Sequence, residues 1–311
     1  MRRALAILVG ASWLCGVAAA APDERLAGTL TSVGSDTASA LVTHWAAAFH
    51  ARHPRVRIQV QGAGSASAPT ALLEGAADLG SMSRPMNAAE AAAARARHGY
   101  APLQLMVARD AIAVFVHPDN PLARITLADV DAIFSSTRRC GAPHAIRHWR
   151  ELGLPAGGTL DRAGLLATGR DASSGTHEVF RETALCGGEF RPDVIAWPGN
   201  GAVVATVAGN REAIGYAGIG YVNGLVKPLA LARDAADGGT APSVANVASG
   251  RYPLARAIYI YVNRRPGQPL AELPRAFLGY ALSAEGQAIV AQEGFVALDA
   301  DEQRRQRALL E

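Results

Sequence analysis

The sequence predicts an α/β protein of two lobes, each with a mixed, mostly parallel sheet flanked by helices. Apolar runs of strand length alternate along the chain with segments of helical spacing. The 311 residues also exceed the roughly 250–300 residues that one hydrophobic core usually serves. With 50% hydrophobic and 18% charged residues, the composition argues against disorder and against a fibrous repeat. The cleft between the two lobes is the expected ligand site.

The first twenty residues are predicted to be a secretory signal peptide. Arg2 and Arg3 precede an apolar run from Ala4 to Leu14, and small residues follow up to Ala20. The run is shorter than the roughly 20 apolar residues of a membrane-spanning helix. We expect cleavage after Ala20 and a periplasmic protein, although the sequence does not distinguish periplasmic from secreted.

Strands and helices alternate in the first part of the chain. Strands are predicted at residues 29–33, 55–60 and 78–81. Apolar residues at helical spacing predict one helix that Pro54 ends and a second that begins after Ser65. Asn87, with a glutamate three residues on, begins a third helix, which Gly99 ends.

The same alternation continues after a turn-rich break at residues 117–121. Strands are predicted at residues 111–116, 164–168, 194–197, 213–217 and 257–262. One helix follows Thr176 and runs to Leu185, a second covers residues 202–208, and a last one covers residues 270–292.

Four strand-to-helix turns are rich in glycine and hydroxyl residues. They lie at residues 34–37, 62–65, 170–176 and 199–201. The first turn of a helix has free backbone N–H groups and a partial positive charge, so several helix starts at one sheet edge can bind an anion. One such turn could be a simple helix cap. Four turns, one of them with Arg170, favour a bound oxyanion.

Arg170 is the best candidate to pair with the anion, because a guanidinium offers a planar fork of donors. Arg84 is a second candidate, although such an arginine more often pairs with a nearby carboxylate. The loops lack the Walker sequence and the GxGxxG fingerprint, which disfavours nucleotides. The histidines show no metal spacing and the cysteines are too few for a zinc cluster, so no metal and no cofactor are expected. A net charge of +3, with the two signs mixed, disfavours nucleic acid.

Cys140 and Cys186 are the two cysteines that follow the predicted signal peptide. An even number in an oxidising compartment favours a disulfide. Closing this loop would stabilise the fold by about 4 kcal/mol. Two buried free thiols are the alternative.

The chain resembles the PstS-type phosphate-binding proteins of ABC phosphate importers over nearly all of residues 21–311. The resemblance rests on residues 33–37, 59–65, 83–84, 132–135, 170 with 174–176, 214–216 and 259–262. It implies a type II periplasmic-binding fold whose two lobes are joined by two crossing strands. The first lobe would be discontinuous, with residues 21–110 and 256–311, and residues 111–255 would form the second.

The resemblance also implies the site and the partners. The phosphate-binding residues would be Asp36, Thr37, Ser65, Ser83, Arg170, Ser174, Gly175 and Thr176, with Ser35, Gly64, Arg84 and Asp171 as further candidates. The implied protein is a monomer that closes around inorganic phosphate and delivers it to an ABC permease.

Ala172 and Ser83 stand where the best-known members of the family have acidic residues. A carboxylate can accept the proton of hydrogen phosphate, whereas sulfate carries no such proton. Asp36 or Asp171 could take this role, although Asp36 could also simply cap a helix. Sulfate, molybdate and organic phosphates therefore remain alternative ligands.

A secreted phosphatase on the same scaffold is the alternative from another functional class. Ser174 and His177 could suggest a nucleophile and a base, but both fall on the first turn of one helix. No GxSxG elbow surrounds the serine. We expect His177 to face solvent and the protein to have no enzymatic activity.

Overall fold

The computed structural model describes residues 25–154 and 156–311. The predicted signal peptide, residues 1–20, and its cleavage after Ala20 lie outside these residues. Within them, every helix is too short or too polar to cross a membrane.

Helices and strands alternate along most of the chain. Their order is β1 (Gly28–Gly34), α1 (Asp36–Arg52), β2 (Val56–Gln61), α2 (Ser67–Leu73), β3 (Leu79–Met82), α3 (Ala88–His98), β4 (Leu103–Val116), β5 (Arg124–Thr126), α4 (Leu127–Phe134), η1 (Trp149–Leu152), β6 (Leu166–Arg170), α5 (Gly175–Ala184), β7 (Ile195–Trp197), α6 (Asn200–Ala208), β8 (Ala213–Gly218), η2 (Ile219–Tyr221), β9 (Lys227–Pro228), β10 (Ala230–Ala232), α7 (Val244–Ala248), β11 (Ala255–Val262), α8 (Glu272–Ala281), α9 (Ala284–Gln292) and α10 (Ala300–Ala308).

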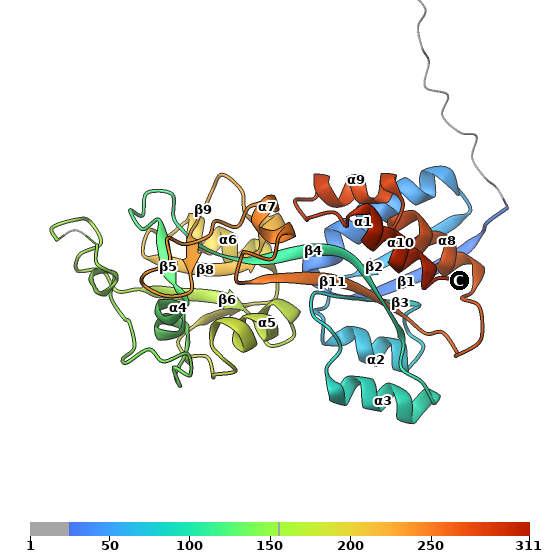
Figure 1. Cartoon of the computed structure of the whole chain (residues 1–311), viewed down its shortest axis with the longest axis horizontal. Helices are drawn as coiled ribbons and strands as arrows, with labels where there is room; N and C mark the ends of the chain where they lie inside the picture. Colours follow the sequence, from blue (N-terminus) through green and yellow to red (C-terminus); the bar gives the residue numbers. More distant parts are fainter. Residues whose placement is uncertain (1–24, 155) are drawn as a thin grey trace, which may run out of the picture.

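Nine strands of the described residues form one mixed sheet in the order β2-β1-β3-β11-β4-β8-β6-β7, with β9 also paired to β4. The outer strands pair in parallel at both ends of the sheet, whereas β11 and β4 run antiparallel to their neighbours. Residues 103–111 of β4 pair with β11, and residues 112–116 pair with β8. As Figure 1 shows, β4 and β11 run side by side between the two halves of the molecule. The predicted α/β fold is confirmed.

The sheet carries two large hydrophobic cores. The first core joins residues between 30 and 108 to residues between 258 and 310. The second core is built from residues 111–254 together with Val296. Helices cover both faces of the first half, with α1, α8, α9 and α10 on one face and α2 and α3 on the other (Figure 1). The predicted lobe boundaries stay a prediction, since β4 runs without a break through residue 110.

Local signals explain where the helices begin. Ser35 is the N-cap of α1 and its side chain accepts a hydrogen bond from the Ala38 backbone N–H. Asn87 and Glu90 form a capping box at α3, and Gly99 ends that helix with a φ of 81°. The predicted helix start at Asn87 and stop at Gly99 are both confirmed.

The last helical segment differs from the expectation. The predicted helix at residues 270–292 is two helices, α8 and α9, because Ser283 caps the start of α9 through the Gly286 backbone N–H. Two further helices, α4 and α10, begin with capping boxes and are not among the predicted helices.

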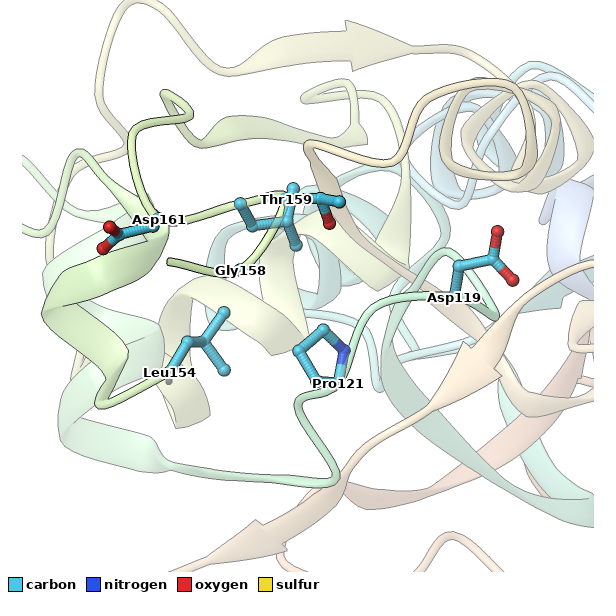
Figure 2. A pocket seen from close by; sticks show the side chains of 7 residues that line it. Asp119, Pro121, Leu154, Gly158, Thr159 and Asp161 are labelled. Atoms are coloured by element: carbon cyan, nitrogen blue, oxygen red, sulfur yellow. The ribbon is translucent and has the colours of Figure 1, made fainter. Parts of the chain in front are cut away.

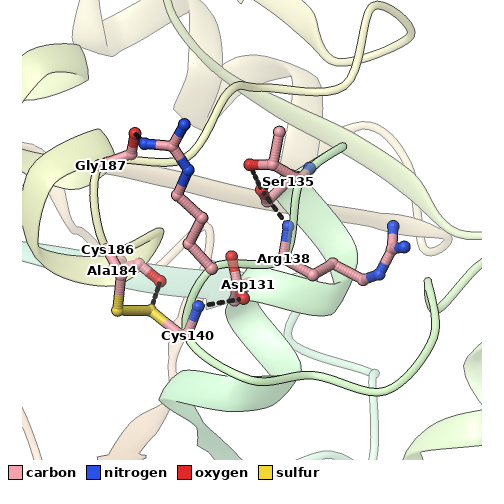
Figure 3. Close-up of a disulfide and its surroundings, with 9 residues drawn as sticks. Asp131, Ser135, Arg138, Cys140, Ala184, Cys186 and Gly187 are labelled. Carbon is pink, nitrogen blue, oxygen red and sulfur yellow. Dashed lines mark hydrogen bonds between the residues drawn. A yellow bond between two sulfur atoms is a disulfide. The ribbon is translucent and has the colours of Figure 1, made fainter.

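A disulfide joins Cys140 to Cys186 with an S–S distance of 2.05 Å, as predicted (Figure 3). It ties the loop that follows α4 to the residues just beyond the C-terminal end of α5. The Cys140 backbone N–H also donates to the carboxylate of Asp131 on α4. The C-terminal side of α5 is therefore anchored covalently, while its N-terminus carries predicted site residues.

Candidate anion-binding site

The start of α1 and the start of α5 meet in the structure. Thr37, in the first turn of α1, is 1% exposed, and Thr176, in the first turn of α5, is fully buried. Their Oγ1 atoms lie 3.0 Å apart. Ser174 is the N-cap of α5 and accepts a hydrogen bond from the Thr176 backbone N–H. Two helix N-termini, each with a partial positive charge, therefore meet at one buried spot.

Two serines from other segments add their hydroxyls to those of the two threonines. Ser65 precedes α2 and Ser83 follows β3, and both are fully buried. The Oγ of Ser65 accepts a hydrogen bond from the Ser83 backbone N–H at 3.1 Å. A Cβ on Gly175 would lie 2.5 Å from the Ser65 Oγ and 2.8 Å from the Ser83 Oγ. Only glycine allows this approach of α5 to the two serines.

Arg170 ends β6 with a side chain that is 0% exposed. Its Nε donates to the Trp197 carbonyl at 3.3 Å and its Nη2 to the Pro198 carbonyl at 2.5 Å. Nη1 lies 3.4 Å from the Asp36 carboxylate but makes no hydrogen bond within the described residues. Burial lowers the pKa of Arg170, and Asp36 partly offsets that effect. The Arg170 guanidinium is therefore held through two of its nitrogens, and its third nitrogen, Nη1, is buried and available to a ligand.

Asp36 is half-buried and links α1 to α6. Its Oδ2 accepts hydrogen bonds from the Asn200 backbone N–H at 3.1 Å and from the Asn200 side chain at 2.9 Å. The Tyr221 hydroxyl donates to the Asp36 backbone carbonyl. Ser35, rather than Asp36, caps α1. Asp171 instead accepts hydrogen bonds from the backbone and side chain of Ser173 within its own loop.

The remaining candidates fall in different places. Gly64 has a φ of 92° and faces the Ser173 backbone, at a close approach that a side chain would block. Arg84 is 4% exposed and binds the two oxygens of Glu90 as a fork. Its Nε also pairs with Glu178 on α5. Arg84 therefore lies in an ion-pair cluster of its own.

Three residues of the site are not among the predicted ligands, although Asn200 lies in the predicted turn at residues 199–201. Asn200 donates to Thr37 Oγ1 at 3.1 Å, and Arg256 donates to Thr176 Oγ1 at 2.9 Å. Asp110 is fully buried and pairs with Arg256. The available signal was the charged residues Arg109 and Asp110 in β4, the single charged residue Arg256 in β11, and an asparagine between two glycines. The charges of Arg170, Arg256, Asp36 and Asp110 cancel, so the helix N-termini and the hydroxyl donors favour an anion.

The expectation that His177 faces solvent is wrong. Its ring is half-buried, stacks on Phe190 with centroids 4.3 Å apart, and places Nδ1 2.9 Å from the Arg170 carbonyl. Burial lowers the pKa of His177. The Ser174 side chain caps α5, so Ser174 and His177 bind different partners and not each other.

Other features of the described residues lie away from this site. No three His, Cys, Asp or Glu side chains of residues 25–154 and 156–311 gather as metal ligands. A hollow of about 300 Å³ (Figure 2) is lined by Asp119, Pro121, Leu154, Gly158, Thr159, Leu160 and Asp161. None of these is a predicted site residue.

Comparison with known proteins identifies relatives along most of the chain. Residues 19–285 match the profile of the PBP superfamily domain. The chain is 44% identical to the phosphate-binding protein PstS of Pseudomonas aeruginosa over 275 residues, which is 88% of this chain and 84% of that protein. It is 30% identical to PstS of Bacillus subtilis, over 88% of this chain and 82% of the relative. A Clostridium perfringens structure, described as a phosphate ABC transporter substrate-binding protein with bound phosphate, superposes with a TM-score of 0.74 at 25% identity and covers 88% of this chain and 100% of that one.

Proposed function

Because the chain belongs to the PBP superfamily and, within it, to the PstS phosphate-binding proteins, we propose that it captures inorganic phosphate between two lobes and delivers it to an ABC importer. The observation that carries this proposal is the buried Nη1 of Arg170, which lacks a hydrogen-bond partner within the described residues. It lies beside the helix starts and hydroxyls that an oxyanion needs.

The proposed ligands combine hydroxyl, backbone N–H and guanidinium donors. They are Asp36, Thr37, Ser65, Ser83, Arg170, Ser174, Gly175 and Thr176. Asp36 is the acidic member, and we propose that it faces the protonated oxygen of hydrogen phosphate. Because most of these groups are buried, each hydrogen bond to the anion would form in a low-dielectric surrounding and be correspondingly strong.

The proposed mechanism is closure of two lobes on the anion. Residues 21–110 with 256–311 would supply Thr37, Ser65 and Ser83, and residues 111–255 would supply Arg170 and α5. An anion that touches both sets binds the closed form better and shifts the population toward it. The Thr37–Thr176 contact and the approach of Gly175 to two serines support this proposal.

We further propose that the protein acts outside the cytoplasm, as a monomer without enzymatic activity. The predicted signal peptide and the disulfide favour an exported protein. The relatives named above are binding proteins, and a permease would be the second partner. Ser174 and His177 serve a helix cap and a buried stack, which gives a phosphatase no support.

Titration calorimetry of residues 21–311 with phosphate, sulfate and molybdate tests this function. We expect saturable binding of one phosphate and much weaker binding of the other two anions. Tighter binding of sulfate or molybdate would contradict the proposal that phosphate is the ligand. Turnover of a chromogenic phosphomonoester would contradict the assignment as a binding protein.

A further inference from the structure

We propose that Arg256, held by Asp110, is a positioning residue that orients the Thr176 hydroxyl so that it donates its proton to the bound anion. The inference rests on the proposed function and assigns a role to an ion pair outside the proposed ligand set.

The ion pair holds Arg256 in a fixed position. Asp110 on β4 and Arg256 on β11 face each other in the antiparallel register. The Asp110 Oδ2 accepts from Arg256 Nε at 2.8 Å and lies 2.6 Å from Nη2. Asp110 is fully buried and the Arg256 side chain is 4% exposed. One edge of the guanidinium is thus fixed, and Nη1 is left to reach Thr176 Oγ1 at 2.9 Å.

A count of protons gives the consequence of this contact. A guanidinium can only donate, whereas a threonine hydroxyl has one proton and two lone pairs. Arg256 Nη1 therefore occupies a lone pair of Thr176, and the hydroxyl proton of Thr176 must point elsewhere. Thr176 cannot donate to Arg256, because a guanidinium has no acceptor.

Thr37 is held in the same way from the other side. The Asn200 Oδ1 accepts from the Gly218 backbone N–H at 3.1 Å, so the amide presents its Nδ2 to Thr37 Oγ1. Both threonines thus receive a hydrogen bond from a fixed donor. They hold two hydroxyl protons, and their mutual contact uses one of them. In the proposed arrangement Thr37 donates to Thr176, so the Thr176 proton is the one that has no acceptor within the described residues.

The Thr176 hydroxyl therefore offers a donor to an anion that binds beside the two threonines. An unprotonated oxygen of the anion is a stronger acceptor for this hydroxyl than a P–OH oxygen. The protonated oxygen of hydrogen phosphate is therefore better placed away from Thr176. The Asp110–Arg256 pair thus orients this hydroxyl without touching the anion.

A double-mutant cycle tests this role. The combined change Asp110→Leu with Arg256→Met removes the pair without leaving a buried charge unpaired, a replacement that is often tolerated. We expect it to raise the Kd for phosphate about tenfold, the order expected for a hydrogen bond that involves a charged group. In a Thr176→Val background the same change should alter Kd less than about twofold, because the hydroxyl is gone. In a Thr176→Ser background the tenfold effect should return.

A second variant tests the same role if the double variant does not fold. Arg256→Lys keeps the charge beside Asp110 but lacks the fork that holds Nη1 at Thr176, and it should also weaken phosphate binding only where residue 176 has a hydroxyl. The matched control is Arg109→Met with Glu302→Leu, which removes a neighbouring ion pair of β4 that faces α10. This control should leave Kd unchanged, and melting temperatures report folding throughout.

Equal losses in the Thr176 and Thr176→Val backgrounds would overturn the inference, since the pair would then act through charge or general packing. An unchanged Kd in the pair variants would overturn it as well. If the unmodified protein binds no phosphate, the proposed function itself fails. That result is distinguishable from a failure of this inference, in which the unmodified protein still binds phosphate.

Discussion

Replacing Arg170 with alanine is the most direct test of the proposed site. The side chain is 0% exposed, and the change removes the buried Nη1 that faces Asp36. Loss of one partner of a buried charged pair costs about 2–5 kcal/mol. That range corresponds to a rise in the Kd for phosphate of roughly 30-fold to several thousand-fold. We expect the upper part of the range, because Asp36 would then face the anion without its counter-charge.

Calorimetry gives the Kd, and thermal unfolding separates binding from stability. Arg191→Ala is the matched control. Arg191 is also buried at 5% exposure, and it donates to the carbonyls of Ile133 and Ile146 while pairing with Asp193. The control should lower the melting temperature and leave Kd within about twofold, since all its nitrogens already have partners, Asp193 and the two carbonyls, outside the proposed site.

Two results would refute this reasoning. If Arg170→Ala binds phosphate within about threefold of the unmodified protein, the guanidinium is not a major ligand. If Arg170→Ala and Arg191→Ala weaken binding equally, the loss follows from general destabilisation of the second half of the chain.

Three further predictions concern selectivity, closure and pH. Asp36→Asn should keep anion binding but lower the ratio of phosphate to sulfate affinity measured by calorimetry, and an unchanged ratio would limit Asp36 to the contact with α6. Glu178 on α5 pairs with Arg84, and this pair should favour the closed form. Glu178→Gln should weaken the pair by about 1 kcal/mol while Arg84 keeps its contact with Glu90, and should raise the Kd for phosphate up to about fivefold. An unchanged Kd would show that this pair does not favour closure. Burial lowers the pKa of His177, so the unfolded chain binds more protons and stability should fall as pH drops below about 6.5 toward that lowered value. His177→Gln should flatten this dependence in thermal unfolding from pH 7.5 to 5, and an equal slope in both proteins would assign it to other groups.

Much of the fold could be predicted because its signals are local. Strand-length apolar runs, helical spacing and caps such as Asn87 act within a few residues, and they predicted the alternation that the structure shows. The periplasmic-binding fold implied by the resemblance is confirmed by the solved Clostridium structure. The helix at residues 270–292 was predicted as one element because its apolar pattern hides the cap at Ser283.

The anion site was predicted in part for the same reason. Thr37 and Thr176 stand at helix starts, which a turn rich in glycine and hydroxyls reveals. Asp110 and Arg256 are 146 positions apart and meet only through the register of β4 and β11. A register between distant strands depends on the whole sheet, so a single sequence did not reveal this pair.

The passage of β4 through both halves of the sheet has a consequence for unfolding. Its first part pairs with β11 beside the first core, and its second part pairs with β8 beside the second core. Melting of either half would deprive the shared strand of pairing partners and expose apolar residues of the other half. The two halves should therefore lose their structure in one cooperative transition, with a calorimetric enthalpy equal to the van't Hoff enthalpy, rather than as two independent domains.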